Sequence, residues 1–397
     1  MRKAHPLAAA GIAIATAAVV VVEASFGGQF RLLSGVFPQP PLPISHLRAP
    51  AGPAGGLDPG RRILGPDAAA PDSRSATPAR PACRLGAKLV PTCNVLWGVA
   101  PGAQTKIDQR YALHKFEADT GRGQAIYHAY HRGLQQMFPT PPEIAMAREP
   151  GHQRLLMINW RPNAGTWAAV ARGDRRVDNF LDRLASHLRT DFRERFILAI
   201  HHEPENDVRV WPGSGYTALD YRAMYRHIVF RLRAHGAGNV VTAMVFMAYA
   251  PWNVKPWWSQ LYPGNDVVDW IAWDTYAYSN PGYGYGDFAQ MVNRTTRFAK
   301  SWPGMYTWAA RHFPAKPFMI AEWGVFQSRM NPRHPVDFLA TVAAQLRRFP
   351  QIKALCYFDT PNAHGHDTRV TATPDLLAKY RWLGAQPTFQ VSLAPLA

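Results

Sequence analysis

From residue 94 onward, short apolar runs alternate with longer stretches in which apolar residues recur every three or four positions. A short uninterrupted apolar run is typical of a strand buried on both faces of a parallel sheet. Eight such runs predict strands over Asn94–Ala100, Ala125–Tyr130, Arg154–Trp160, Phe196–His202, Val240–Tyr249, Val268–Tyr276, Phe318–Trp323 and Ile352–Phe358.

The stretches between these runs predict amphipathic helices. In three segments, which begin at Arg176, Asp220 and Val336, the apolar positions fall on one helical face. These positions are Val177, Phe180, Leu181, Leu184 and Leu188 in the first segment, Tyr221, Met224, Tyr225, Ile228 and Leu232 in the second, and Phe338, Leu339, Val342 and Leu346 in the third. Gly236 and Gly238 supply a stop signal for the second helix.

Eight strand–helix units predict an α/β fold, the (β/α)8 TIM barrel, over residues 83–397. The alternative, a doubly wound sheet, usually has a glycine-rich phosphate-binding turn after its first strand. The corresponding segment here, "WGVAPGAQ", does not have that pattern. In a (β/α)8 barrel the carboxyl ends of the strands form the active-site face, so polar residues at those ends are candidates for chemistry.

Two of the predicted strands end in a glutamate. The fourth strand runs into "AIHHEP", which places Glu203 at its end, and the seventh ends in "MIAEWG", which contains Glu322. A buried carboxylate loses hydration and is costly without a partner. A salt bridge would explain one such residue, but two at matching positions of one barrel face indicate a shared purpose. Paired carboxylates are what the hydrolysis of a glycosidic bond requires.

Aromatic residues are frequent near the other strand ends, and flat aromatic rings pack well against the C–H faces of sugars. Packing in the core would explain any single one of them, but together they favour a carbohydrate-binding cleft. They are Trp160, Trp211, Tyr249, Trp252, Trp257, Trp258, Trp273, Tyr276, Tyr278 and Trp323.

The first 82 residues show no pattern of a folded core. Residues 1–24 have a basic start and an apolar stretch, which predict a signal peptide cleaved before Ser25 or an uncleaved membrane anchor. Residues 25–82 are rich in proline, glycine and alanine and predict a disordered linker. We therefore expect a secreted, extracellular protein in which Cys83 and Cys93 form a disulfide. Cys356 lies in an apolar run and is expected to be a buried thiol.

The formal net charge is +17, which raises the question of an anionic partner. The charge comes mostly from arginines that are scattered along the predicted helices, and no zinc-finger, homeodomain or RNA-recognition signature is present. We therefore expect no nucleic-acid partner, no cofactor and a monomeric protein whose partner is a polysaccharide substrate. Contact with a membrane is expected only through an uncleaved N-terminal anchor.

Over roughly residues 94–383 the chain resembles glycoside hydrolase family 26, the β-mannanase family of retaining barrel glycosidases. The resemblance lies in His202-Glu203 after the fourth strand, in Asp274-Thr275-Tyr276 of the sixth strand and in the "AEWG" of the seventh. It implies that Glu203 is the acid/base and Glu322 the nucleophile. It also implies that His202 binds near the reacting sugar and that Tyr276 contacts the nucleophile.

The resemblance further implies substrate-binding roles for the aromatic residues. Trp211, eight residues past Glu203, could match a tryptophan that lines the family's cleft, and Trp160, Trp273 and Trp323 are expected to line it as well. Phe358 lies in the eighth strand where many such enzymes place a tryptophan under the sugar. The chain departs from the family after Glu203, where Pro-Glu-Asn-Asp replaces the usual Met-Asn-Gly, so β-mannan is only the most favoured substrate.

Three other interpretations stay open. "HHEPEND" and "HGHD" contain residue types that bind metals, but the spacing matches no HExxH pattern, and adjacent strand residues such as His201 and His202 point in opposite directions. We therefore expect no metal. A serine hydrolase would need a G-x-S-x-G turn, which the sequence does not have. A non-catalytic carbohydrate-binding or cell-envelope protein on the same barrel is the alternative from another class.

Overall fold

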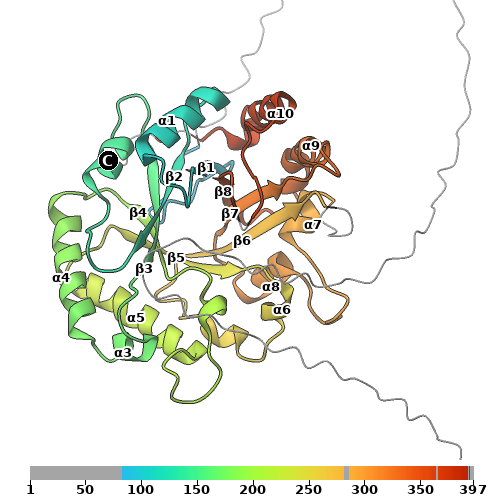
Figure 1. Cartoon of the computed structure of the whole chain (residues 1–397). Coiled ribbons are helices and arrows are strands. Elements are labelled where there is room, and N and C mark those ends of the chain that lie inside the picture. The colour runs from blue at the N-terminus through green and yellow to red at the C-terminus, as the bar shows by residue number, and fades with distance from the viewer. Residues whose placement is uncertain (1–82, 281–285, 364, 392, 394–397) are drawn as a thin grey trace, which may run out of the picture. The chain divides into compact units, whose positions relative to one another are not determined.

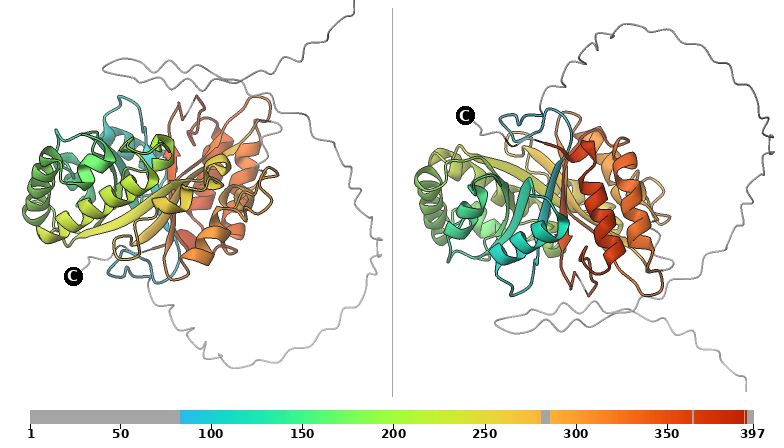
Figure 2. Two further views of the ribbon diagram at one scale, coloured as in Figure 1. Left: turned by 90° about the horizontal axis from the view of Figure 1, so that it is seen from below. Right: turned by 90° about the horizontal axis from the view of Figure 1, so that it is seen from above.

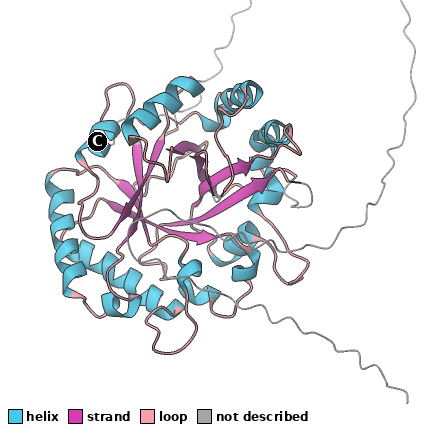
Figure 3. Ribbon diagram, in the orientation of Figure 1, coloured by secondary structure: helices cyan, strands magenta, loops and turns pink. Residues whose placement is uncertain are grey.

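Eight parallel strands close into a single barrel in the computed structural model, which describes residues 83–280, 286–363, 365–391 and 393. Helices surround the strands on the outside (Figures 1 and 3). The predicted signal segment and linker, residues 1–82, lie outside the described residues. Among the described residues, no helix combines the length and the apolar character that crossing a membrane requires.

The strands follow each other around the barrel in chain order, and the eighth pairs with the first. They are β1 Leu96–Pro101, β2 Ile126–Arg132, β3 Leu155–Arg161, β4 Phe196–Ile200, β5 Val240–Met247, β6 Trp270–Tyr278, β7 Phe318–Phe326 and β8 Ile352–Asp359. All eight predicted strands are therefore confirmed, with ends that differ by a few residues.

The main covering helices are amphipathic, as their periodicity predicts. The helical elements are α1 Gln109–Thr120, α2 Pro141–Ala147, α3 Trp167–Ala171, α4 Arg175–Thr190, α5 Ala218–Ala234, α6 Ala250–Asn253, α7 Phe288–Val292, α8 Met305–His312, α9 His334–Leu346 and α10 Pro374–Gly384, with short 3-10 helices η1 Pro204–Asp207, η2 Trp258–Leu261 and η3 Pro387–Phe389. Every apolar position predicted to share a face in α4, α5 and α9 is buried. Two views at right angles to the first show the helices packed along the outside of the strands (Figure 2).

Strand alternation divides the core into two layers. Residues such as Leu156, Ile158 and Phe196 point outward and pack against the helices, whereas Met157, Ile197 and Ala199 fill the barrel. The inside is packed with apolar side chains near the amino ends of the strands, so functional groups are concentrated at the carboxyl ends.

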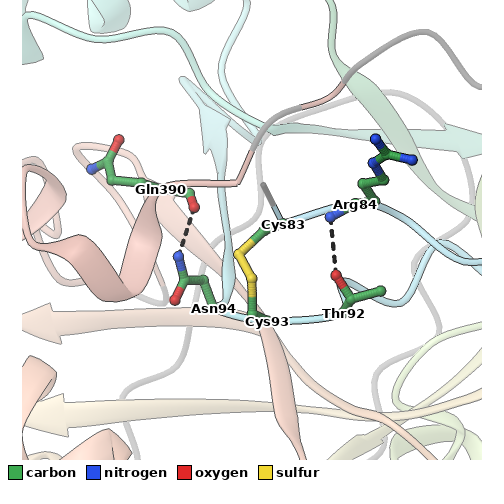
Figure 4. Close-up of a disulfide and its surroundings, with 6 residues drawn as sticks. All are labelled: Cys83, Arg84, Thr92, Cys93, Asn94 and Gln390. Carbon is green, nitrogen blue, oxygen red and sulfur yellow. Dashed lines mark hydrogen bonds between the residues drawn. A yellow bond between two sulfur atoms is a disulfide. The ribbon is translucent and has the colours of Figure 1, made fainter. Parts of the chain in front are cut away.

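A disulfide loop packs against the amino end of the barrel. Cys83 and Cys93 are bonded, which confirms the predicted pairing, and Cys356 is a free and buried cysteine, as expected (Figure 4). Within the loop, Leu89 is fully buried among the residues that fill the barrel, and the backbone oxygen of Lys88 accepts a 2.7 Å hydrogen bond from Trp270. The loop therefore packs onto the start of β6, away from the carboxyl ends of the strands.

Candidate active site

Glu322 faces the inside of the barrel because β7 contains a bulge. The register of β7 shifts against both neighbouring strands between Ile320 and Trp323. As a result, Ile320 and Trp323 both point outward into the helix-facing layer, although they are three positions apart. The extra residue in the strand turns Glu322 inward beside its register partner Asp274 on β6. Bulges of this kind commonly redirect a side chain next to an active site.

Two tyrosine hydroxyls hold the Glu322 carboxylate. Tyr130 on β2 donates to Oε1 and Tyr276 on β6 donates to Oε2, each at 2.7 Å. Glu322 is buried, and this burial raises its pKa, while the two tyrosine hydrogen bonds oppose the rise by stabilising the charged form. The contact that the resemblance implied for Tyr276 is therefore present, and Tyr130 is a second partner that sequence reasoning missed. The alternation of His128, Tyr130 and Arg132 along β2 was the available signal.

Glu203 lies three residues past the end of β4, where it caps η1. Its backbone is left-handed at φ 49°, as is that of His201 at φ 51°. Such a conformation costs a residue with a side chain about 1–2 kcal/mol, and strained positions of this kind cluster at functional sites. Burial, followed by the negative charge of Glu322, raises the pKa of Glu203 to about 8. Asn206 donates a 3.1 Å hydrogen bond to Glu203 Oε2.

Two further side chains complete the centre of the site. One ligand atom each of His202, Glu203 and Asp274 lie within 4.8 Å of one another. Burial and then the charges of Glu322 and Glu203 raise the pKa of Asp274 well above its usual value, and burial lowers that of His202. These three residues are the group in the described chain that could hold a metal ion.

His201 points away from this group and supports it from behind. Trp167 donates its indole N–H to His201 Nδ1 at 3.3 Å, so the neutral ring carries its proton on Nε2 and donates it to Asp207 at 2.8 Å. Asp207 also pairs with Arg161 on β3 at 3.0 Å. The divergence of His201 and His202 agrees with the expectation that the two histidines do not share one ion. This network fixes the strained turn that carries Glu203.

Glu205 is a third glutamate next to the site, one that sequence reasoning did not single out. It is buried, and its Oε1 accepts hydrogen bonds from the backbone N–H of Met247 at 3.1 Å and from the indole of Trp258 at 2.9 Å. Burial raises the pKa of Glu205 to about 7, although the Trp258 hydrogen bond opposes that rise. Glu205 thereby ties η1 to β5 and adds a third acidic group near Glu203.

Three of the predicted substrate-binding residues are placed elsewhere. Trp160, Trp273 and Trp323 are fully buried in the layer between strands and helices, so the expectation that they line a cleft is wrong. Trp160, for example, stacks on Phe180 of α4. The reason is strand alternation: a residue adjacent to an inward-facing side chain, as Trp323 is to Glu322, points outward.

The other two predicted aromatic residues do not belong to that buried layer. Phe358 is buried, with its ring edge-on to Tyr130 and Tyr276 at 6.1 Å from each. Trp211 is 57% exposed in the loop after η1. Their roles in binding substrate stay predictions. Of the histidines in "HGHD", His366 stacks on Phe326, and residue 364 lies outside the described residues.

No family model matches the chain. Among solved structures, the barrel is similar to a ruminal GH26 endo-β-1,4-mannanase, with a TM-score of 0.51 and 14% identity over 75% of this chain and 64% of that one. It is also similar to a GH26 β-mannanase from Bacteroides ovatus, with a TM-score of 0.50 and 13% identity over 75% of this chain and 90% of that one. The barrel has the fold of glycoside hydrolase family 26. The resemblance predicted from the sequence is thereby confirmed at the level of the fold.

A curated relative, Endoglucanase H from Acetivibrio thermocellus, is 27% identical over 240 residues. That match covers 57% of this chain and 24% of the relative. The chain thus spans less than two thirds of the length of this relative and of the ruminal mannanase.

Proposed function

We propose that the protein is a secreted glycoside hydrolase that cleaves the backbone of a β-linked polysaccharide with retention of configuration. The observation that carries this proposal is the pairing of Glu203, three residues past the end of β4, with Glu322 in the middle of β7. Glu203 has a pKa raised to about 8, so it holds its proton at neutral pH. Two tyrosine hydroxyls donate hydrogen bonds to Glu322, which stabilises its ionised form. Cleavage of a glycosidic bond requires two carboxyl groups in different environments, one that keeps its proton and acts as the acid and one that is ionised and acts as the nucleophile.

In this mechanism Glu322 attacks the anomeric carbon while Glu203 gives its proton to the departing glycosidic oxygen. The bond from the anomeric carbon to that oxygen breaks, and a covalent glycosyl ester forms on Glu322. Glu203, now a carboxylate, takes a proton from water, whose oxygen displaces Glu322. Loss of the Glu322 charge in the ester lowers the pKa of Glu203 at the moment when it has to act as a base.

β-Mannan is the first substrate to test, because the solved proteins with this fold include enzymes described as endo-β-1,4-mannanases. The curated relative is described as an endoglucanase, so β-glucan is the second. Release of reducing sugar should be measured on mannans, mixed-linkage glucan, β-1,3-xylan and acidic polysaccharides.

Substitution of the two glutamates tests the mechanism. Glu322→Ala should lower kcat by several orders of magnitude without unfolding the protein, because the nucleophile is lost. Glu203→Ala should still cleave substrates whose leaving group needs no proton, and added azide should then yield a β-glycosyl azide. The matched control is Glu194→Ala, an exposed glutamate before β4 at the opposite end of the barrel, which should keep wild-type activity.

Proton NMR of early products should show retention, and the Glu203 and Glu322 carboxyl groups should lie about 5–5.5 Å apart in a crystal structure. Inversion of configuration, or substantial activity in the Glu322→Ala protein, would show that the two roles are wrongly assigned.

A metal-dependent hydrolase is the second candidate, and the cluster of His202, Glu203 and Asp274 is the observation that favours it. The two candidates respond differently to a chelator. Full activity after dialysis against EDTA is expected for the glycosidase, whereas loss of activity and rescue by zinc would favour the metal-dependent enzyme.

A further inference from the structure

Two arginines stand side by side at the carboxyl ends of β2 and β3. Arg132 and Arg161 are register partners in the barrel. Arg161 pairs with Asp207 at 3.0 Å, whereas Arg132 is exposed and forms no hydrogen bond or ion pair with any residue that the structure describes. Like charges at directly paired positions destabilise a sheet, so this pair stands apart from the arginines scattered over the helices.

Positive charge exceeds negative charge at this position. Asp207 is the carboxylate shared by the group, and it also accepts a hydrogen bond from His201. Burial works against it, but the His201 hydrogen bond and the charges of Arg161 and Arg209 hold the pKa of Asp207 below its usual value. Burial and the neighbouring charge of Arg161 lower the pKa of Arg132. One guanidinium therefore pairs with Asp207 and two more lie within reach of its charge, a surplus that an anionic ligand would balance.

The surplus charge lies beside the proposed acid/base. The Arg161 guanidinium donates a 3.4 Å hydrogen bond to the backbone oxygen of His202, the residue before Glu203. Its charge also counteracts the rise of the Glu203 pKa. A polysaccharide that runs across the strand ends to reach Glu203 and Glu322 would therefore pass close to Arg132.

We infer that the substrate is an acidic polysaccharide, and that the exposed guanidinium of Arg132 binds a carboxylate carried by one of its sugar units. The planar guanidinium presents parallel N–H donors that match the two oxygens of a carboxylate. This inference rests on the proposed function and names the substrate class of the same site. A neutral mannan or glucan gives Arg132 no charge to bind.

The test compares one polymer with and without its charge. A β-linked glucuronomannan and its carboxyl-reduced form, in which each glucuronate has become a neutral glucose, are given to the full-length protein. The wild-type kcat/KM should be at least about tenfold higher on the acidic form, because a charge-assisted hydrogen bond of this kind contributes about a 10- to 100-fold effect. Raising the salt concentration should shrink the difference.

In Arg132→Gln the preference for the acidic polymer should fall about tenfold or more. The matched control is Arg195→Gln, an exposed arginine directly before β4 at the other end of the barrel, which should leave the preference unchanged. Cleavage of both polymers at equal rates, or an unchanged preference in Arg132→Gln, would overturn the inference and leave the proposed function standing.

If neither polymer is cleaved, calorimetric titration with the acidic polymer separates the two ideas. Binding that Arg132→Gln weakens would keep the anion site and refute the proposed hydrolase activity on this polymer. Absence of binding by the wild-type protein would overturn the inference.

Discussion

The pKa values of individual acidic residues in this protein differ according to their surroundings. Glu194 is exposed beside Arg148, whose hydrogen bond and charge lower the pKa of Glu194. Glu205 and Asp274 are buried and Glu203 is half-buried near them, and burial raises the pKa of all three. Residues of one chemical type thus become a surface ion and a group of candidate proton donors.

This difference predicts how stability depends on pH. The folded protein holds the Glu203 proton to a pKa of about 8, whereas an unfolded chain releases it near the ordinary value of 4.5. The stability that this proton contributes is fully present below the unfolded value and is lost as the pH rises through about 8. Glu203→Gln cannot ionise, so its melting temperature relative to wild type should rise between pH 5 and pH 9.

Differential scanning calorimetry of both proteins at several pH values would measure the change. Asp337→Asn, which removes an exposed acid on α9, serves as the control and should give a nearly constant difference from wild type. A constant difference for Glu203→Gln as well would contradict the raised pKa.

Among the elements, β7 and the disulfide loop depart most from a regular (β/α)8 pattern. The bulge in β7 delivers Glu322 to the inside, and the loop between Cys83 and Cys93 packs Leu89 under the inner core. An antiparallel bridge between Leu85 and Pro91 and a 2.9 Å ion pair between Lys88 and Asp269 hold the loop in place. The loop has a structural purpose and lies away from the chemistry.

Removal of the disulfide should therefore lower stability without changing catalysis. In Cys83→Ser/Cys93→Ser the unfolded chain regains the freedom of a short closed loop, which should cost about 2–3 kcal/mol of unfolding free energy. Urea denaturation would measure this loss, and kcat on the best substrate should stay within about twofold of wild type. Reducing agent should destabilise the wild-type protein but leave the double variant unaffected. A large fall in kcat would place the loop in the active site after all.

For the molecule as a whole, the described residues from Cys83 onward account for a closed barrel with its own core. Asn94 donates a 2.7 Å hydrogen bond to the backbone oxygen of Gln390, so the entrance and the exit of the domain are joined directly (Figure 4). The contacts that close the barrel and join its two ends therefore all lie within the described residues from Cys83 onward.

Deletion of residues 1–82, with Cys83 and Cys93 retained, should leave a folded and active domain. The deleted part has the composition of a chain that cannot bury enough apolar surface to order itself. The melting temperature and kcat of the shortened protein should equal those of the full chain within error. Insoluble protein, or a clear fall in melting temperature, would show that the N-terminal part contributes to the fold.

Much of this architecture follows from local patterns in the amino-acid sequence. The eight strands, the buried faces of α4, α5 and α9, and the cysteine pair are determined by periodicity and composition, which depend on neighbours within a few positions along the chain. The position of Glu203 just past β4 follows in the same way, whereas β7 continues beyond Glu322 to Phe326.

The contacts between side chains in the site are determined by the packing of segments that lie far apart in the sequence. Tyr130 and Glu322 are 192 residues apart in the chain, and no local pattern connects them. The bulge in β7 turns Glu322 inward. The alternation of side chains along the strands points Trp160, Trp273 and Trp323 outward, away from the site. Barrel closure and register thus selected the partners of each charged group, because a shift of one residue moves a side chain to the opposite face of its strand.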